Sequence, residues 1–327
     1  LVLGFHSTID GLKRITAPII EHLFQQSPDL LQQVKEQLDT VPTEINSPVD
    51  LLVALISSMR RGKALQLMIR NQETADWTMK HLGYDEIRMG GTSGNMANAL
   101  SPLPFRKILV YANPLTKEQA ELFAEEPNLF VMTDQQELQP PRDAWKETGI
   151  YALHWIFEYQ AGETINLPGL KFTTPRANRF IAAWNPVNNK LQIKPSFKEG
   201  LKKMAGAFSH MLISGFHILS ETYPDGTTWT DYLIPVAQYL KQLRSDYPHL
   251  KMHYEFASIA SSQIRLGIVQ HVLTVVNSLG LNEVELVALL QDIGETALAE
   301  NIESQNSIRA VFAGLAKLME ITGLDRI

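Results

Sequence analysis

The order of apolar and polar positions predicts short strands that alternate with helices, most regularly after residue 198. Alternation at this spacing is typical of a mainly parallel sheet with helices on both faces. The sequence therefore predicts an α/β fold for this part of the chain. After an initial helix, the predicted elements are strands over 210–215, 251–257 and 275–279, and helices over 228–243, 263–273, 283–293 and 307–321.

The first part of the chain has the same kinds of elements at less regular spacing. An apolar strand over residues 1–5 runs into a polar turn over 6–10, and helical periodicity predicts one helix over 16–38. Further predicted elements are a helix from residue 46, a strand over 65–69, a helix over 72–82 and a strand over 107–111.

Two β-type segments interrupt this pattern in the middle of the chain. Residues 151–159 form an aromatic-rich alternating run, and residues 178–184 form a second apolar run. Because both segments lie between α/β elements, they predict a small sheet inserted as a lid.

Acidic residues follow two of the predicted strands. Glu255 ends one strand, and Glu285 lies in the first turn of the helix after the next strand. Open parallel sheets bind ligands beyond the carboxyl ends of their strands, and two carboxylates there suit a hydrated Mg²⁺ ion. The alternative interpretation is structural, because Asn282 and Glu285 have the spacing of a helix-capping box. His253 is predicted to form hydrogen bonds at the strand end and not to bind a metal.

A glycine-rich turn at residues 90–94 opens another predicted helix. Glycines at such a turn expose backbone N–H groups to a ligand oxygen, although the Gly-Gly-x-x-Gly spacing differs from the dinucleotide-binding fingerprint. A plain tight turn is the alternative.

Composition excludes several classes of function. The 327 residues are 45% apolar and 20% charged, with a net charge of −6 and no cysteine. Thiol catalysis, thiolate metal sites and disulfides are therefore excluded, and the net charge opposes binding to nucleic acids or anionic membranes. The sequence contains no apolar run of bilayer-spanning length and does not begin with a secretion signal, which predicts a cytoplasmic protein.

Six motifs in order resemble the ADP-dependent sugar kinases, the glucokinase and phosphofructokinase family of the ribokinase-like superfamily. The motifs are Gly-Phe-His-Ser-Thr-Ile-Asp (4–10), Gly-Gly-Thr-Ser-Gly (90–94), Glu-Tyr-Gln-Ala-Gly-Glu (158–163), Arg-Ala-Asn-Arg-Phe (176–180), His-Tyr-Glu (253–255) and Ser-Leu-Gly-Leu-Asn-Glu-Val-Glu (278–285).

The resemblance implies a ribokinase-like α/β fold in two domains. The large nucleotide and metal domain would comprise residues 1–9, 76–148 and 186–327, and its C-terminal part is expected beyond Ile327. The small sugar-binding lid would comprise residues 10–75 and 149–185.

The resemblance also implies the residues of the site. Glu255 and Glu285 would orient the water ligands of Mg²⁺, with His253 and Asn282 around them. The implied substrate-binding residues are Asp10, Gln66, Gly91, Thr92, Asn95, Gln160, Arg176 and Arg179.

Three departures from the family pattern affect the implied site. Thr92 stands where the family usually has Gln or Asn, and Gln66 stands where its glucokinases tend to have Glu. The Gly-x-Gly-Asp motif that carries the catalytic base is absent from residues 1–327, so the catalytic Asp is expected beyond Ile327.

The activity implied by the resemblance is transfer of the β-phosphoryl group of ADP to a sugar hydroxyl, with Mg²⁺ required and AMP released. The sequence around Gln160 favours glucose, which would give glucose 6-phosphate in glycolysis. Fructose 6-phosphate is the alternative acceptor, and a non-catalytic sugar or nucleotide sensor is the alternative function. The expected partners are the sugar and ADP, with the protein a monomer or a small homo-oligomer.

Overall fold

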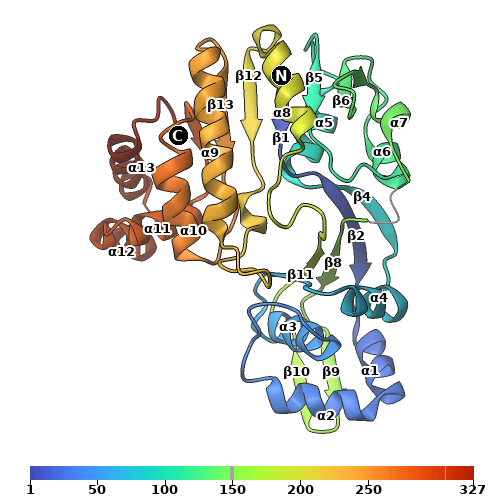
Figure 1. Cartoon of the computed structure of the whole chain (residues 1–327). Helices are drawn as coiled ribbons and strands as arrows, with labels where there is room; N and C mark the ends of the chain where they lie inside the picture. The colour runs from blue at the N-terminus through green and yellow to red at the C-terminus, as the bar shows by residue number, and fades with distance from the viewer. Residues whose placement is uncertain (148–150, 306) are drawn as a thin grey trace. The chain divides into compact units, whose positions relative to one another are not determined.

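The computed structural model describes residues 1–147, 151–305 and 307–327, and its contacts divide the chain into two compact units. Unit 1 comprises Leu1–Ser7, Gly91–Gly149 and Val187–Ile327. Unit 2 comprises Thr8–Gly90 and Ile150–Pro186. Both units are drawn in Figure 1, coloured along the chain.

The described residues of unit 1 form a seven-stranded sheet in the order β14-β13-β12-β1-β5-β6-β7. Neighbouring strands pair in parallel, except that β7 is antiparallel to β6. The predicted mainly parallel sheet is thus confirmed. The strands are β1 (Val2–Gly4), β5 (Ile108–Val110), β6 (Leu129–Met132), β7 (Leu138–Gln139), β12 (His210–Ile213), β13 (Lys251–Glu255) and β14 (Ser278–Gly280).

Helices pack on this sheet through apolar stripes. Helices α8 and α9 cover the face of the sheet that is turned to the viewer in Figure 1, and Leu201 of α8 and Leu240 of α9 are fully buried. The helices of unit 1 are α5 (Thr92–Leu100), α6 (Lys117–Leu122), α7 (Pro141–Ala144), α8 (Pro195–Met204), α9 (Trp229–Asp246), α10 (Ser262–Gly267, continued by a π turn over Ile268–Val272), α11 (Glu283–Asp292), α12 (Thr296–Gln305) and α13 (Ile308–Thr322).

Unit 2 is built on a five-stranded sheet in the order β3-β11-β8-β2-β4. One face is apolar and buried, with Trp155, Phe157 and Phe180 in its core. The strands are β2 (Thr8–Arg14), β3 (Leu65–Met68), β4 (Glu86–Gly90), β8 (Leu153–Tyr159) and β11 (Asn178–Trp184); a hairpin of β9 (Thr164–Leu167) and β10 (Leu170–Thr173) and helices α1 (Ala17–Gln26), α2 (Pro28–Gln37), α3 (Pro48–Arg61) and α4 (Gln72–His81) complete the unit.

Two predicted elements near the start of the chain are wrong. The predicted turn over 6–10 overlaps β2, because Thr8–Arg14 pairs with β4 on one side and β8 on the other. The predicted helix over 16–38 is two helices, α1 and α2. Pro28 disfavours a helical conformation at Ser27, so α1 ends there and α2 begins at the proline.

The contact units also correct one part of the predicted domain division. Residues 8, 9, 76–90 and 186 were assigned to the large domain, but they belong to unit 2, where β4 pairs antiparallel with β2. The predicted boundary between residues 148 and 149 lies outside the described residues. The lid and nucleotide-binding roles of the two domains remain predictions.

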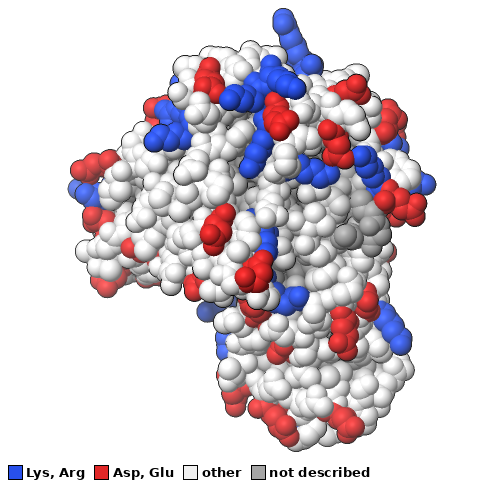
Figure 2. Space-filling model, viewed as in Figure 1, with Lys and Arg blue, Asp and Glu red and all other residues white. Residues whose placement is uncertain are grey.

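Acidic and basic residues are interspersed over the face drawn in Figure 2. Of the helices that the structure describes, none has both the length and the apolar character needed to cross a bilayer.

A buried ion pair joins two helices of unit 1 and generates the first prediction. The Arg265 guanidinium of α10 donates to both carboxylate oxygens of Asp292 of α11, at 2.5 and 2.8 Å, and the Asp292 side chain is only 6% exposed. Replacing Asp292 by Ala should lower the free energy of unfolding by about 3 kcal/mol, because a buried cation loses its partner. Chemical denaturation measures this change.

Glu320→Ala is the matched control. Glu320 pairs with Lys317 at 3.2 Å, but its side chain is 71% exposed, so its loss should cost less than about 1 kcal/mol. Equal effects of the two substitutions would contradict this account of the pair between α10 and α11.

Candidate functional site

The carboxyl edge of the unit 1 sheet brings together two of the predicted motifs. Strands β13 and β14 pair in parallel, with His253 opposite Ser278 and Glu255 opposite Gly280. Because α11 begins directly after β14, the first turn of this helix lies at the same edge as the end of β13. The local sequence pattern predicted this juxtaposition.

Neighbouring groups hold the Glu255 side chain in place. His253 contacts the Ser278 hydroxyl through Nδ1 at 2.8 Å and Glu255 Oε2 through Nε2 at 3.1 Å. Gly280 leaves room for the carboxylate, since a Cβ at this position would lie 2.2 Å from Glu255 Oε2. His253 therefore positions Glu255.

Glu285 forms the capping box that the sequence pattern predicted as its structural role. Its backbone N–H donates to the Asn282 side chain at 3.0 Å, and its Oε2 accepts from the Asn282 backbone N–H at 3.0 Å. Burial raises the pKa of the Glu285 carboxyl, and so does the negative charge of Glu255. Hydrogen bonds from Asn282 act in the opposite direction.

The same two charges act on Tyr254, which lies beneath them in β13. Burial is the largest cause of the raised pKa of its phenol, and the carboxylates of Glu285 and Glu255 raise this pKa further. The two acids are therefore close enough to repel each other. A divalent cation at this edge would relieve the repulsion between them.

The donor set fits a hydrated Mg²⁺ ion better than a directly chelated metal. Within residues 1–147, 151–305 and 307–327, no group of three or more His, Cys, Asp or Glu residues is arranged to hold a metal ion. Mg²⁺ dehydrates reluctantly and is commonly held by one or two carboxylates through its water ligands. Glu255 and Glu285 offer that number of carboxylates.

A second set of predicted residues lies on the polar face of the unit 2 sheet. Strand register places Asp10 of β2 opposite His154 of β8, and Arg179 of β11 opposite Glu158 of β8. Gln66 of β3 pairs with Ile181, two residues from Arg179. Since paired residues and residues two apart point to the same face, Asp10, Gln66 and Arg179 share one face of this sheet.

Asp10 is an incompletely satisfied acid on this face. Its Oδ1 atom has no hydrogen-bond partner among the described residues, and His154 Nδ1 lies 3.9 Å from it. Burial raises the pKa of Asp10 to about 6, against the effect of the Arg179 charge. Gly90 makes room for the carboxylate, because a Cβ there would lie 2.0 Å from Oδ1.

His154 is a residue of this site that sequence reasoning missed. Its side chain is only 6% exposed, and its position within the apolar run of β8 gave no local signal. Only the register of β2 and β8 brings it beside Asp10.

The remaining predicted residues occupy two regions. Gly91, with φ of 72°, precedes α5, which begins at Thr92 and carries Asn95 as an exposed residue. In unit 2, Gln160 follows β8 and is exposed, and Arg176 is exposed beside Gly62. The Gly91 set belongs to unit 1, whereas the Asp10 set belongs to unit 2.

The sheet of unit 1 is largely parallel and has an acidic pair at its carboxyl edge. With the solved structures that the chain resembles, this sheet defines an α/β protein of the ribokinase-like class. The sequence model described as "ADP-specific Phosphofructokinase/Glucokinase conserved region" matches residues 1–327. The chain therefore belongs to this family of ADP-dependent sugar kinases, which confirms the resemblance.

Individual relatives include both kinds of named kinase. The chain is 30% identical to an ADP-specific phosphofructokinase of Methanosarcina acetivorans, over 100% of the chain and 67% of the relative. It is 32% identical to an ADP-dependent glucose/glucosamine kinase of Pyrococcus abyssi, over 100% of the chain and 69% of the relative. The chain thus spans about two thirds of the length of these relatives.

Two solved structures are similar over 99% of the chain. One is the last common ancestor of ADP-dependent phosphofructokinases from Methanosarcinales, with a TM-score of 0.79, 30% identity and 67% of its own length covered. The other is an ADP-dependent kinase in complex with fructose-6-phosphate and ADPβS, with a TM-score of 0.80, 28% identity and 65% of its length covered.

The raised pKa of Asp10 predicts how stability depends on pH. The carboxyl binds its proton more tightly in the folded state, with a pKa of about 6 against an ordinary 3.8. The contribution of Asp10 to the free energy of unfolding should therefore fall as pH rises from about 4 to about 6 and then stay level. Asp10→Asn should remove this fall and raise the free energy of unfolding at pH 7 by about 1–3 kcal/mol.

Urea denaturation of both proteins at pH 4 and pH 7 measures the effect. A substitution that lowered stability equally at both pH values would contradict the proposed cost of ionised Asp10.

Proposed function

We propose that this chain provides the sugar and metal sites of an ADP-dependent hexose kinase, which transfers the β-phosphoryl group of ADP to a sugar hydroxyl and releases AMP. The observation that carries the proposal is that the pairing of β13 and β14 brings Glu255 and Glu285 to the carboxyl edge of the sheet, where burial and the charge of Glu255 raise the pKa of Glu285. Membership of the kinase family supports the same activity.

The acids at the sheet edge would hold Mg²⁺ through its water ligands. The ion, when bound, supplies positive charge beside the phosphoryl groups. His253 fixes the orientation of Glu255, and Asn282 fixes that of Glu285. Because both carboxylates are held before the ion arrives, less ordering is required on binding.

Asp10 and its neighbours would bind the sugar. Above pH 6 the Asp10 carboxylate is mainly ionised, and it is then a strong acceptor for sugar hydroxyls. His154 lies close enough to share a hydroxyl with it. In unit 1, Gly91, Thr92 and Asn95 at the start of α5 remain the substrate-binding residues that the family resemblance implied.

Different residues favour the two candidate acceptors. As predicted from the sequence, the residues around Gln160 favour glucose as the acceptor. Arg176 and Arg179 favour fructose 6-phosphate, because both are exposed, and among the described residues neither forms an ion pair. Guanidinium groups suit phosphate through paired N–H donors. Since the phosphofructokinase relatives also support it, we propose fructose 6-phosphate as the first acceptor to test.

The test of the acceptor uses the natural full-length protein with Mg²⁺ and ADP. If Arg179 binds the phosphate of the acceptor, Arg179→Met should raise the KM for fructose 6-phosphate about tenfold or more, as expected for loss of a charge-assisted hydrogen bond. The KM for glucose should change less than about threefold, since glucose carries no phosphate.

Arg61→Met, at the end of α3, is the matched control because Arg61 is also exposed. Transfer from ATP alone, or to neither sugar, would contradict the proposed activity. Binding of sugar and ADP without transfer would favour the non-catalytic alternative.

The metal role of Glu285 can be separated from its capping role. Glu285→Gln keeps an oxygen that can accept from the Asn282 N–H but removes the charge. We expect kcat to fall about 100-fold, because charge stabilisation at the phosphoryl group is lost, with little change in the KM for the sugar.

Glu283→Gln in the same helical turn is the control, since Glu283 is exposed and has no part in the proposed site. If kcat were unchanged in Glu285→Gln while stability fell, Glu285 would be a helix cap only.

A further inference from the structure

Unit 1 contains a cavity that none of the proposed sugar or metal residues lines. Its volume is about 510 Å³, and its walls come from the segment after β5, the segment leading into α8, and the first turns of α9. A cavity of this size is sufficient for a small-molecule ligand. The metal and sugar sites therefore leave its lining residues without a role.

Two lysines, Lys194 and Lys198, are among the residues that line this cavity. Lys198 is partly buried and forms no ion pair among the described residues. Burial lowers the pKa of its amine, and its Nζ lies 5.7 Å from the centre of the Tyr239 ring. Lys194 shares Asp134 with Lys146. An anion in the cavity would offset the cost of burying the Lys198 ammonium.

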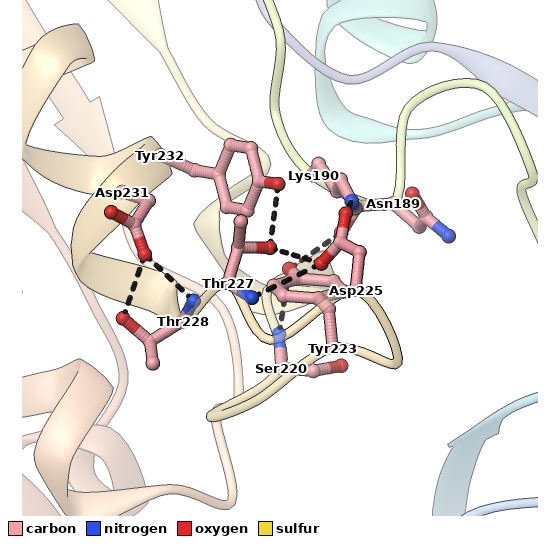
Figure 3. A network of polar contacts seen from close by, with 9 residues as sticks. All are labelled: Asn189, Lys190, Ser220, Tyr223, Asp225, Thr227, Thr228, Asp231 and Tyr232. Atoms are coloured by element: carbon pink, nitrogen blue, oxygen red, sulfur yellow. Dashed lines mark hydrogen bonds and ion pairs between the residues drawn. The ribbon is translucent and has the colours of Figure 1, made fainter.

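The acidic residue of the lining is already engaged in the structure. The Asp231 carboxylate accepts from the Thr228 backbone N–H at 2.8 Å and from the Thr228 hydroxyl at 3.0 Å, which caps α9 (Figure 3). The backbone carbonyl of Asp231 receives no hydrogen bond from the residue four positions later in the helix, because that residue is Pro235, which has no N–H. This carbonyl can accept a hydrogen bond from a ligand.

The aromatic wall of the cavity is fixed by a polar network. The Tyr232 hydroxyl contacts that of Thr227 at 2.8 Å, and Lys190 Nζ lies 5.2 Å from the centre of the Tyr232 ring and 5.0 Å from that of Tyr223. Lys190 also forms an ion pair with Asp225, which accepts from Thr227 (Figure 3). Tyr232 is thus ordered without a ligand, which lowers the entropy cost of binding.

We propose that this cavity binds a small organic phosphomonoester at a site separate from the sugar and metal residues. The phosphoryl oxygens contact Lys194 and Lys198, two cations that match a dianion. The organic body packs against Tyr232, Leu191 and Val236, which also line the cavity. A hydroxyl of the ligand can donate to the Asp231 carbonyl.

Titration calorimetry of the natural full-length protein with three probes tests the site. Phenyl phosphate carries both the dianion and the apolar body. Inorganic phosphate carries only the anionic group, and phenol resembles only the apolar body. We expect phenyl phosphate to bind at least about tenfold more tightly than either of the other probes, and saturating Mg²⁺ and ADP should not displace it.

Substitutions assign the binding to the cavity. Lys198→Met should weaken phenyl phosphate binding at least about tenfold, and Lys198→Arg should largely retain it. Lys202→Met, an exposed position on the same helix, should change the affinity less than about twofold. Circular dichroism checks that each variant is folded.

Four results would overturn the proposal. They are no binding of phenyl phosphate, equal affinity for inorganic phosphate, displacement by Mg²⁺ and ADP, and an unchanged affinity in folded Lys198→Met. None of these results bears on phosphoryl transfer, so the failure of this site and the failure of the proposed kinase activity are distinguishable.

Discussion

The repulsion between Glu255 and Glu285 is the interaction on which the account of the site depends. Parallel pairing of β13 and β14 places the two acids at one sheet edge, and partial burial of Glu285 prevents water from screening the repulsion fully. Gly280 allows the Glu255 carboxylate to occupy its position. The capping box stabilises α11 but leaves the charge of Glu285 only partly compensated. A bound cation would offset the charge of both acids.

Unit 2 contains a comparable unfavourable charge. The Asp10 carboxylate is buried deeply enough to raise its pKa to about 6, and one of its oxygens lacks a hydrogen-bond partner among the described residues. Each unit thus keeps an acid whose charge is only partly compensated within that unit. Polar ligands, a hydrated cation in one unit and a sugar in the other, would supply the missing compensation. The proposed kinase activity gives both acids a reason to be present.

Local patterns in the sequence predicted the features that depend on nearby residues. The capping box of Asn282 and Glu285, and the position of Glu255 at a strand end, follow from spacing along the chain. Two features that depend on pairing between strands distant in sequence were missed. Residues 6–10 were predicted as a turn because β4 and β8, the partners of β2, are distant in sequence. His154 was missed for the same reason. The break between α1 and α2 was missed for a different reason: Pro28 is a local signal for it, but the continuous periodicity of the apolar positions obscured that signal.

The titration of Glu285 tests the central claim most directly. Site-resolved carbon NMR of the natural full-length protein can follow the Glu285 carboxyl through a pH series with and without Mg²⁺. The account predicts a pKa above the ordinary range for glutamate without the ion, and a fall in that pKa when Mg²⁺ is added. An ordinary pKa that Mg²⁺ leaves unchanged would contradict both the mutual repulsion of the two acids and the metal site built on it.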